Sequence, residues 1–291
     1  LDSDQVLLFK AKIASQRITE LDIDKTKMIS RIKQEEKLYE ENKVKGSGPV
    51  GKAASAVINE EFWIYTYQPT YGTEAKIPRT FAPPGRIWVE GSWGSWCWDP
   101  MFQAAVASLG SEYAAYSTVF STLLPTQQDN GVIPNDYQAY VWSEDGNDPN
   151  NHSQPPIASY FVWKLYSRFN NKEFLQEAYP SLDRWYQWWS ATDPEGHPRR
   201  DGNEDGLYEW GADYKYEKTD NHRMKRWAAH WETGLDDSPM WDDIQMKGIH
   251  MNLNSIWLNS LRALDSLMMS KIAEEVEKEK EAKSFKNNYN Q

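Results

Sequence analysis

A stretch of twelve residues near the end of the sequence combines side chains that could do acid–base chemistry with aromatic rings. It runs from Trp231 to Asp242, contains four carboxylates, two hydroxyls and two tryptophans, and is interrupted by Gly234 and Pro239. A core helix would not carry four carboxylates, because buried charges are costly unless they are paired. A ligand-binding wall accommodates both features, since its rings contact the ligand and its surroundings can shift the pKa values of its carboxyl groups.

Residues 232–238 read E-T-G-L-D-D-S. This segment resembles the E-[ST]-G-x-D-x-S signature of inverting glycosidases built on an (α/α)6 barrel, most closely glycoside hydrolase family 63 and more distantly the family 37 trehalases. Glu232, Gly234, Asp236 and Ser238 all fall in register with it. The resemblance implies that Asp236 is the general acid, and that Glu232 and Ser238 orient it or bind sugar hydroxyls.

An inverting glycosidase needs a protonated carboxylic acid and a second carboxylate that activates water. An apolar surrounding or a nearby negative charge favours the protonated form of the acid. Here Trp231, Leu235 and Trp241 could supply apolar walls for Asp236, and Glu232 and Asp237 could supply the charge. We include Trp241 among the candidate substrate-binding residues.

A second aromatic cluster lies earlier in the chain, where residues 88–100 read W-V-E-G-S-W-G-S-W-C-W-D-P. Taken alone, Asp99 could equally be the N-cap of a helix that begins at Pro100, because aspartate caps well and proline suits the first turn. The family resemblance favours a second role, since a W-D pair at this place hydrogen-bonds the sugar in the −1 subsite. We therefore take Asp99, Trp96 and Trp98 as candidate substrate-binding residues.

Two further segments supply candidates for substrate contact. Gln154 precedes two prolines, and the family often has a glutamine at this helix start whose amide contacts sugar hydroxyls; an ordinary helix start is an equally good interpretation. Residues 201–211 read D-G-N-E-D-G-L-Y-E-W-G, similar to loops that line the substrate side of these barrels, so Glu209 and Trp210 are also candidates.

The same loop begins like a calcium loop. Asp201, Asn203 and Asp205 alternate with other residues and Gly206 follows, but Ala212 stands at the twelfth position, where an EF-hand has glutamate. The sequence therefore predicts a structural calcium ion only as an alternative to a substrate-side loop, and no cofactor is required.

The elements that must position these residues are helical. Apolar periodicity predicts an all-α chain, and the resemblance implies that residues 50–291 are roughly the first half of an (α/α)6 barrel, preceded by a helical lead-in over residues 1–49 with Ile18, Leu21, Met28 and Ile32 at helical spacing. The expected helices of the barrel part cover residues 53–67, 101–109, 111–124, 152–169, 172–191 and 252–282.

The general base is the part of the chemistry that the sequence does not provide. In the family it is a glutamate in the second half of the barrel, and the glutamates after Met251 follow a charged helix surface. We expect the base to lie in a C-terminal remainder of the barrel, as a second fragment or chain that would be the partner of this one.

Composition excludes several other classes of function. The net charge of −11 argues against nucleic acid, and no apolar run approaches the ~20 residues that span a bilayer. The single cysteine, Cys97, excludes an internal disulfide. The histidines lack the spacing of a zinc site; they are His152, His197, His222, His230 and His250.

The sequence therefore predicts an inverting α-glucosidase-type enzyme acting on a carbohydrate substrate. The alternative is a carbohydrate-binding or scaffold protein that keeps the aromatic site without catalysis. A sugar isomerase or epimerase on the same barrel would depend on histidines that are not evident here. A periplasmic or secreted location suits oligosaccharide cleavage, and a cytoplasmic one suits a small compatible solute.

Overall fold

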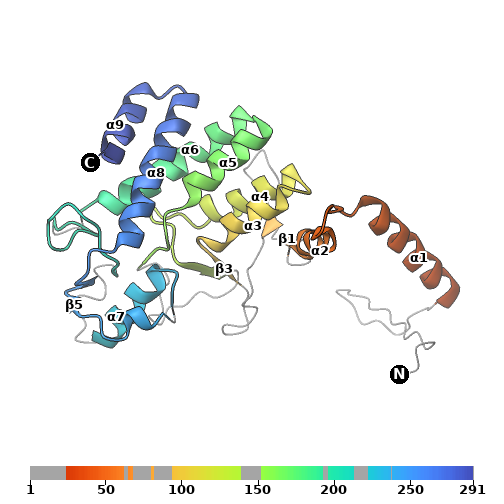
Figure 1. Cartoon of the computed structure of the whole chain (residues 1–291), viewed down its shortest axis with the longest axis horizontal. Helices are drawn as coiled ribbons and strands as arrows, with labels where there is room; N and C mark the ends of the chain where they lie inside the picture. The colour runs from red at the N-terminus through yellow and green to blue at the C-terminus, as the bar shows by residue number, and fades with distance from the viewer. Residues whose placement is uncertain are drawn as a thin grey trace, which may run out of the picture. The chain divides into compact units, whose positions relative to one another are not determined.

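The computed structural model describes residues 24–61, 65–67, 80–81, 94–138, 152–192, 196–212, 222–236 and 238–290. The chain divides into two compact units, residues 1–59 and residues 60–291. Figure 1 shows the helices that make up each unit. Ile18, Leu21, Trp88, Trp93 and Asp237, which entered the sequence argument, lie outside the described residues. The proposed domain boundary after residue 49 stays a prediction.

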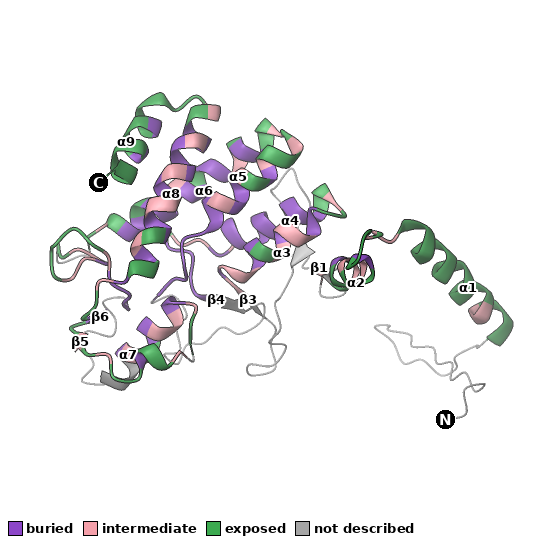
Figure 2. Ribbon diagram, viewed as in Figure 1, coloured by how far each residue is buried: buried purple, intermediate pink, exposed green. Residues whose placement is uncertain are grey.

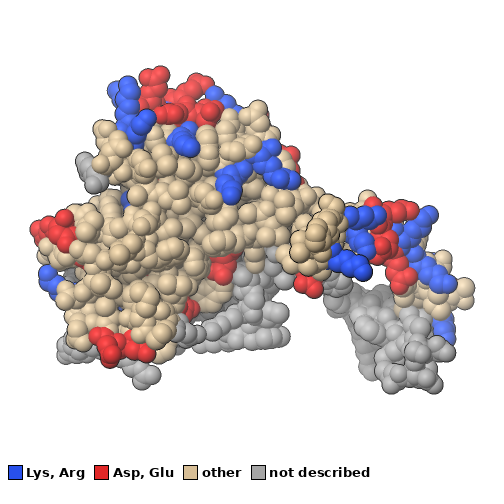
Figure 3. Space-filling model, viewed as in Figure 1, with Lys and Arg blue, Asp and Glu red and all other residues tan. Residues whose placement is uncertain are grey.

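The first unit contains the helix α1 (Lys25–Asn42) and most of α2 (Gly51–Glu61). The Asp24 side chain caps α1 by accepting a hydrogen bond from the Lys27 N–H. None of the residues of α1 is buried, and charged side chains of both signs lie along the helix (Figure 3). The turn between the helices is held by Asn59, whose amide donates to the Val44 carbonyl and accepts from its N–H. This unit carries none of the candidate site residues.

The second unit is built from helical hairpins. They are α3 (Asp99–Ala107) with α4 (Glu112–Leu123), α5 (Ala158–Phe169) with α6 (Lys172–Ser190), and α8 (Ile256–Glu275) with α9 (Glu279–Asn290). Within each hairpin the two helices pack together, and α5 also packs against α3 and α8. The helix α7 (His222–Glu232) lies apart from the hairpins, beside the short strands β5 (Met246–Lys247) and β6 (His250–Met251) (Figure 1).

Helix ends follow capping chemistry where the sequence provides it. Ser111, Asn171 and Ser255 each accept a hydrogen bond from a first-turn N–H of α4, α6 and α8. The expected helices 111–124 and 172–191 are confirmed. The single helix expected over residues 252–282 is wrong: Glu277 adopts a left-handed φ of 64° and separates α8 from α9.

Two more expected helices differ at their ends. The helix expected over residues 53–67 ends at Glu61, and Thr66–Tyr67 form the strand β1, paired with β2 (Thr80–Phe81). The helix expected from residue 152 begins at Ala158, because residues 152–157 precede it as a buried, non-helical segment. The two consecutive prolines in that segment favour such an extended path.

The core of the second unit is aromatic. Trp185, Trp188 and Trp189 on α6 are all buried, and Phe120 and Phe174 pack edge to face between α4 and α6. Figure 2 shows buried residues on the facing sides of α4, α5, α6 and α8. In the part of the chain that the structure describes, no helix is long and apolar enough to cross a membrane.

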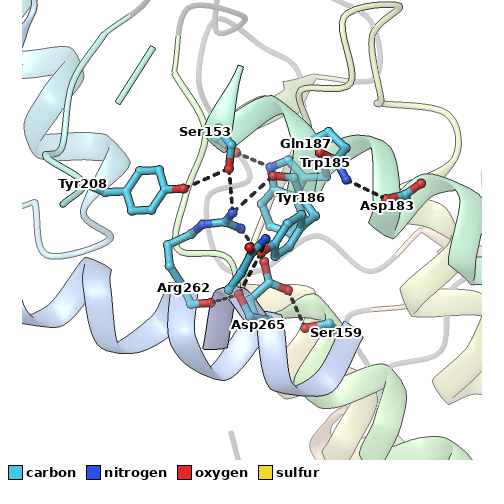
Figure 4. Close-up of polar contacts among 12 residues, drawn as sticks. Ser153, Ser159, Asp183, Trp185, Tyr186, Gln187, Tyr208, Arg262 and Asp265 are labelled. Carbon is cyan, nitrogen blue, oxygen red and sulfur yellow. Dashed lines mark hydrogen bonds and ion pairs between the residues drawn. The ribbon is translucent and has the colours of Figure 1, made fainter. Parts of the chain in front are cut away.

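A buried ion pair anchors α8 to α6. Arg262 donates to Asp265 at 2.7 Å and to the Tyr186 carbonyl at 3.3 Å, and its guanidinium lies over the Tyr186 ring at 4.1 Å. Ser159 of α5 donates to the other Asp265 oxygen at 2.6 Å, so three helices meet here (Figure 4). Burial raises the pKa of Asp265 to about 6, against the opposing effect of Arg262.

Short antiparallel pairs join the loops between the helices. β3 (Gly94–Trp96) pairs with β4 (Asp136–Gln138), and β5 (Met246–Lys247) pairs with β6 (His250–Met251). The first pair holds the segment that leads to Asp99 against the segment that leads toward α5. The pairing of β3 with β4 thus brings together the segments on either side of the α3–α4 hairpin, whereas β5 and β6 pair within the single connection between α7 and α8.

Candidate active site

The segment before α3 is held from two sides. The Gln154 side-chain oxygen accepts hydrogen bonds from the Cys97 N–H at 2.9 Å and the Trp98 N–H at 3.1 Å, and the Asn135 carbonyl also accepts from Cys97 at 2.9 Å. Gln154 is buried, and its oxygen is therefore used to fix this segment. In the structure this oxygen positions Trp98 and Asp99, and the expected contact of the Gln154 amide with sugar hydroxyls stays a prediction.

Asp99 is the first residue of α3 and not its cap. Trp98 stands at the N-cap position without a side-chain capping bond, so the interpretation of Asp99 as a capping aspartate is wrong. Asp99 is half-buried. Burial raises the pKa of its carboxyl group, its own backbone N–H lowers it, and the charge of Asp236 raises it. Asp99 and Asp236 thus lie within electrostatic reach of each other.

The loop that carries Asp236 packs directly on Trp98. Gly234 has a φ of +67°, and a Cβ atom built there would lie 2.5 Å from Cζ2 of the Trp98 indole. Only glycine permits both this backbone conformation and this close approach. Asp236 follows two residues later and is exposed. The W-D segment and the acid-bearing loop, far apart in the sequence, therefore meet through Trp98 and Gly234.

Internal hydrogen bonds shape the rest of this loop. The Thr233 hydroxyl donates to the His230 carbonyl at 2.6 Å and accepts from the Leu235 N–H at 2.9 Å. The Ser238 hydroxyl accepts from the Met240 N–H and so caps the short 3-10 helix Pro239–Trp241. Ser238, expected to orient the acid or bind hydroxyls, therefore serves the loop's own backbone.

Glu232 is a structural residue and not a substrate contact. It is fully buried, and Arg200 donates to both of its oxygens, from Nη2 to Oε1 at 2.7 Å and from Nε to Oε2 at 2.8 Å. The Ser153 N–H donates to Oε1 at 3.1 Å and the Gly211 N–H to Oε2 at 2.9 Å. Since four hydrogen bonds occupy this carboxylate, its expected contact with substrate is corrected.

The expected contacts of two tryptophans are corrected for the same reason. Trp210 is 0% exposed and donates its indole N–H to the Ser255 hydroxyl at 3.0 Å, at the start of α8. Trp241 is 1% exposed and donates to the Leu235 carbonyl at 3.0 Å. Both rings belong to the core beneath the site, where they position α8 and the Asp236 loop.

Among the described residues of the two site segments, three indole rings are partly accessible. Trp96 at the end of β3 and Trp98 are half-buried, and Trp98 meets Phe102 edge to face at 5.6 Å. Trp231 is also half-buried and lies 5.8 Å from the imidazole of His152. Burial and the charge of Arg200 lower the pKa of His152 to about 3, so this ring is neutral at physiological pH.

Three carboxylates of the 201–209 loop lie close together, as they do in a calcium-binding loop. Ligand atoms of Asp201, Asp205 and Glu209 lie within 4.8 Å of one another, and oxygen ligands of this kind suit Ca²⁺. The Asn203 side chain is engaged with Asp205 and Asn254. The amide of Asn254 lowers the pKa of Asp205, whereas burial raises the pKa of Glu209 to about 6. A structural calcium ion stays a prediction.

Sequence reasoning missed the residues that join these segments. Arg200, Ser153 and Gly211 surround Glu232, and nothing in their types or spacing marks them as its partners. Glu209 was not predicted as a calcium ligand either, although it stands at the ninth position of the loop, which also contributes to the ion site of an EF-hand. That position could have been found from the sequence.

The fold and the site together define a class. Helical hairpins, with carboxylates and tryptophans gathered on the loops before α3 and after α7, are the arrangement expected of an α-barrel glycoside hydrolase. The chain belongs to the family of the mannosylglycerate hydrolase MGH1-like glycoside hydrolase domain, whose model matches residues 92–291. The resemblance to glycoside hydrolase family 63 is thereby confirmed.

Solved structures show the same fold. An uncharacterized conserved protein from Thermus thermophilus is 15% identical, with a TM-score of 0.54 over 80% of this chain and 60% of that one. The family 63 mannosylglycerate hydrolase from the same organism, in complex with glucose, is 16% identical, with a TM-score of 0.52 over 83% of this chain and 62% of that one. The all-α barrel prediction is confirmed. The chain spans about three fifths of the length of these structures.

Proposed function

We propose that the protein is an inverting glycoside hydrolase that cleaves α-linked glucosides, with Asp236 as the general acid. The observation that carries this proposal is the meeting of two distant segments, because the Trp98 ring lies on Gly234 and the charge of Asp236 acts on Asp99. Membership in a glycoside hydrolase family supports the reaction class.

The proposed chemistry assigns one task to each group. Asp236 protonates the glycosidic oxygen of the leaving group, and Asp99 lies close enough for the charge of Asp236 to raise the pKa of its carboxyl group. Asp99 accepts a hydrogen bond from a sugar hydroxyl, and Trp96 and Trp98 contact the apolar faces of the ring. We place the general base outside these 291 residues, in the remainder of the barrel.

The substrate class rests on two different supports. The family resemblance favours glucose in the −1 subsite, whereas the matched family model is named for mannosylglycerate hydrolase and one similar structure carries that name. A small α-mannoside with an acidic aglycone is therefore the second candidate. Both kinds of substrate belong in the same test panel.

The test is proton NMR of hydrolysis by the full-length protein, with α-linked glucose disaccharides and mannosylglycerate as substrates. We expect the β-anomer of the released sugar to appear first, as inversion at an α-linkage requires. Asp236→Asn should lower kcat by ~10²–10⁴, the usual contribution of a general acid. Asp242→Asn is the matched control, since Asp242 is exposed in the same region and has no assigned role.

Two results would overturn the proposal. Undiminished turnover by Asp236→Asn would remove Asp236 from the chemistry, and prompt release of the α-anomer would exclude inversion. Sugar binding without turnover of any panel member by the wild-type protein would instead support the alternative, a carbohydrate-binding protein.

A further inference from the structure

Arg200 is buried completely although it carries a full charge. Its side chain is 0% exposed, and its guanidinium lies 4.8 Å from the centre of the Trp188 ring. Beyond its two bonds to Glu232, Nη1 donates to the Arg199 carbonyl at 2.7 Å and to the Ala212 carbonyl at 3.3 Å. A planar fork with five N–H groups can make these bonds together, whereas a lysine ammonium cannot.

Glu232 connects Arg200 to three segments of the site. Ser153 belongs to the segment whose Gln154 holds the backbone before Asp99. Gly211 belongs to the 201–212 loop. Glu232 itself ends α7 and begins the loop to Asp236. We call the four residues Ser153, Arg200, Gly211 and Glu232 the Glu232 junction.

We propose that Arg200 is a positioning residue that sets the spacing of Asp99 and Asp236 through the Glu232 junction. This inference rests on the proposed function, because the spacing matters most where the two carboxyl groups act on one sugar. Arg200 itself does not touch the substrate. It acts by holding Glu232 with both oxygens fixed, so that the N–H groups of Ser153 and Gly211 find their acceptors at defined places.

Arg200→Lys in the full-length protein tests this role. The charge is kept and the fork is lost, so we expect kcat to fall about 10- to 100-fold with a smaller change in KM, because a misplacement near 1 Å costs about 100-fold in rate. The pH profile of kcat/KM should shift as well, since the mutual effect of Asp99 and Asp236 depends on their separation.

Arg262→Lys is the matched control. It makes the same exchange in another buried arginine–carboxylate pair, Arg262 and Asp265, whose contacts lie on α5, α6, α8 and Tyr208. We expect it to lower the melting temperature while kcat and the pH profile stay within about twofold of wild type. An equal loss of kcat in both variants would overturn the proposal, because general destabilisation would then explain the effect.

A second measurement does not depend on turnover. In protein labelled with ¹³C at the aspartate carboxyl groups, Asp236→Asn should lower the pKa of Asp99 by removing a like charge. In the Arg200→Lys background the same exchange should have a clearly smaller effect. An unchanged effect would overturn the positioning role, even if no glycoside were cleaved and the proposed function had failed.

Glu232→Gln tests the same role if Arg200→Lys cannot be purified in a folded form. This change keeps the shape of the side chain but turns one acceptor into an amide NH₂ group that faces N–H donors. Loss of the Asp99–Asp236 coupling is again the expected result. Full coupling and full kcat in Glu232→Gln would overturn the proposal.

Discussion

At the scale of single residues, Gly234 is the point where two distant segments of the site touch. Its φ of +67° costs about 1 kcal/mol for a residue with a side chain, and a Cβ atom there would also meet the Trp98 ring. We expect Gly234→Ala to lower the free energy of unfolding by about 1–3 kcal/mol and kcat/KM at least tenfold, measured by urea denaturation and initial rates.

Gly248→Ala is the control for that prediction. Gly248 has nearly the same φ, +64°, but nothing lies within 4 Å of a Cβ atom built there. It should show the backbone cost of about 1 kcal/mol alone, with unchanged kcat/KM. Equal effects of the two substitutions on kcat/KM would show that the contact with Trp98 has no part in the site.

Single residues also show which parts of the candidate site could be predicted from the sequence. Asp236 and Asp99 could be selected because each stands in a short segment whose residue types fit one chemistry. Glu232 stands in the same signature, but its burial and its four hydrogen bonds depend on segments that are 21 to 79 residues away. The expectation that Trp210 and Trp241 contact substrate was wrong for a similar reason, since an aromatic ring suits a sugar-binding site and a core equally well.

At the scale of elements, the 201–209 loop is the place where a metal ion can be tested. Asp201, Asp205 and Glu209 offer oxygen ligands at short mutual distances. A ligand that binds only the folded protein stabilises it, so calcium chloride should raise the melting temperature of the wild-type protein by several degrees. Asp201→Asn should abolish most of that rise, because it removes an anionic ligand.

The control for the calcium prediction is Asp242→Asn, which removes an exposed carboxylate elsewhere and should keep the full effect. Magnesium chloride at the same concentration separates calcium binding from general ionic strength, since Mg²⁺ demands a smaller octahedral site. A melting temperature that does not respond to calcium in the wild-type protein would contradict the predicted ion.

Elements were predictable where local chemistry determines their ends. Ser111 begins α4 and Asn171 begins α6 as capping residues do. The break at Glu277 was not predictable, because glutamate and its lysine-rich neighbours favour a continuous helix and only the packing of α9 on α8 selects the turn. The late start of α5 has a similar cause, since residues 152–157 are used to make bonds to the site.

At the scale of the whole molecule, buried histidines make the fold sensitive to acid. Burial lowers the pKa of His152 to about 3 and that of His250 to about 4, below the ordinary 6.5. Between pH 6.5 and pH 4 the unfolded chain therefore binds protons that the folded protein does not. Stability is present above pH 6.5 and lost as the pH falls, by up to about 1.4 kcal/mol per pH unit for each histidine.

Urea denaturation at pH 7.5, 6 and 5 measures this loss. In His152→Asn the free energy of unfolding should fall less steeply over that range, because asparagine does not titrate. The difference in slope should be up to about 1.4 kcal/mol per pH unit, the contribution of one proton. Identical slopes in the wild-type protein and in His152→Asn would contradict the prediction.

The Glu232 junction also determines when the site can form during synthesis of the chain. Ser153 and Glu232 are 79 residues apart, and Arg200 and Glu232 are 32 apart, whereas each helical hairpin is made of neighbours in sequence. Local contacts form before those that close long loops. The hairpins α3–α4 and α5–α6 can therefore fold while the ribosome is still making α7. Until residue 232 is made, Arg200 lacks the carboxylate that neutralises it, so the candidate acid and the junction that holds it are completed only after these two hairpins.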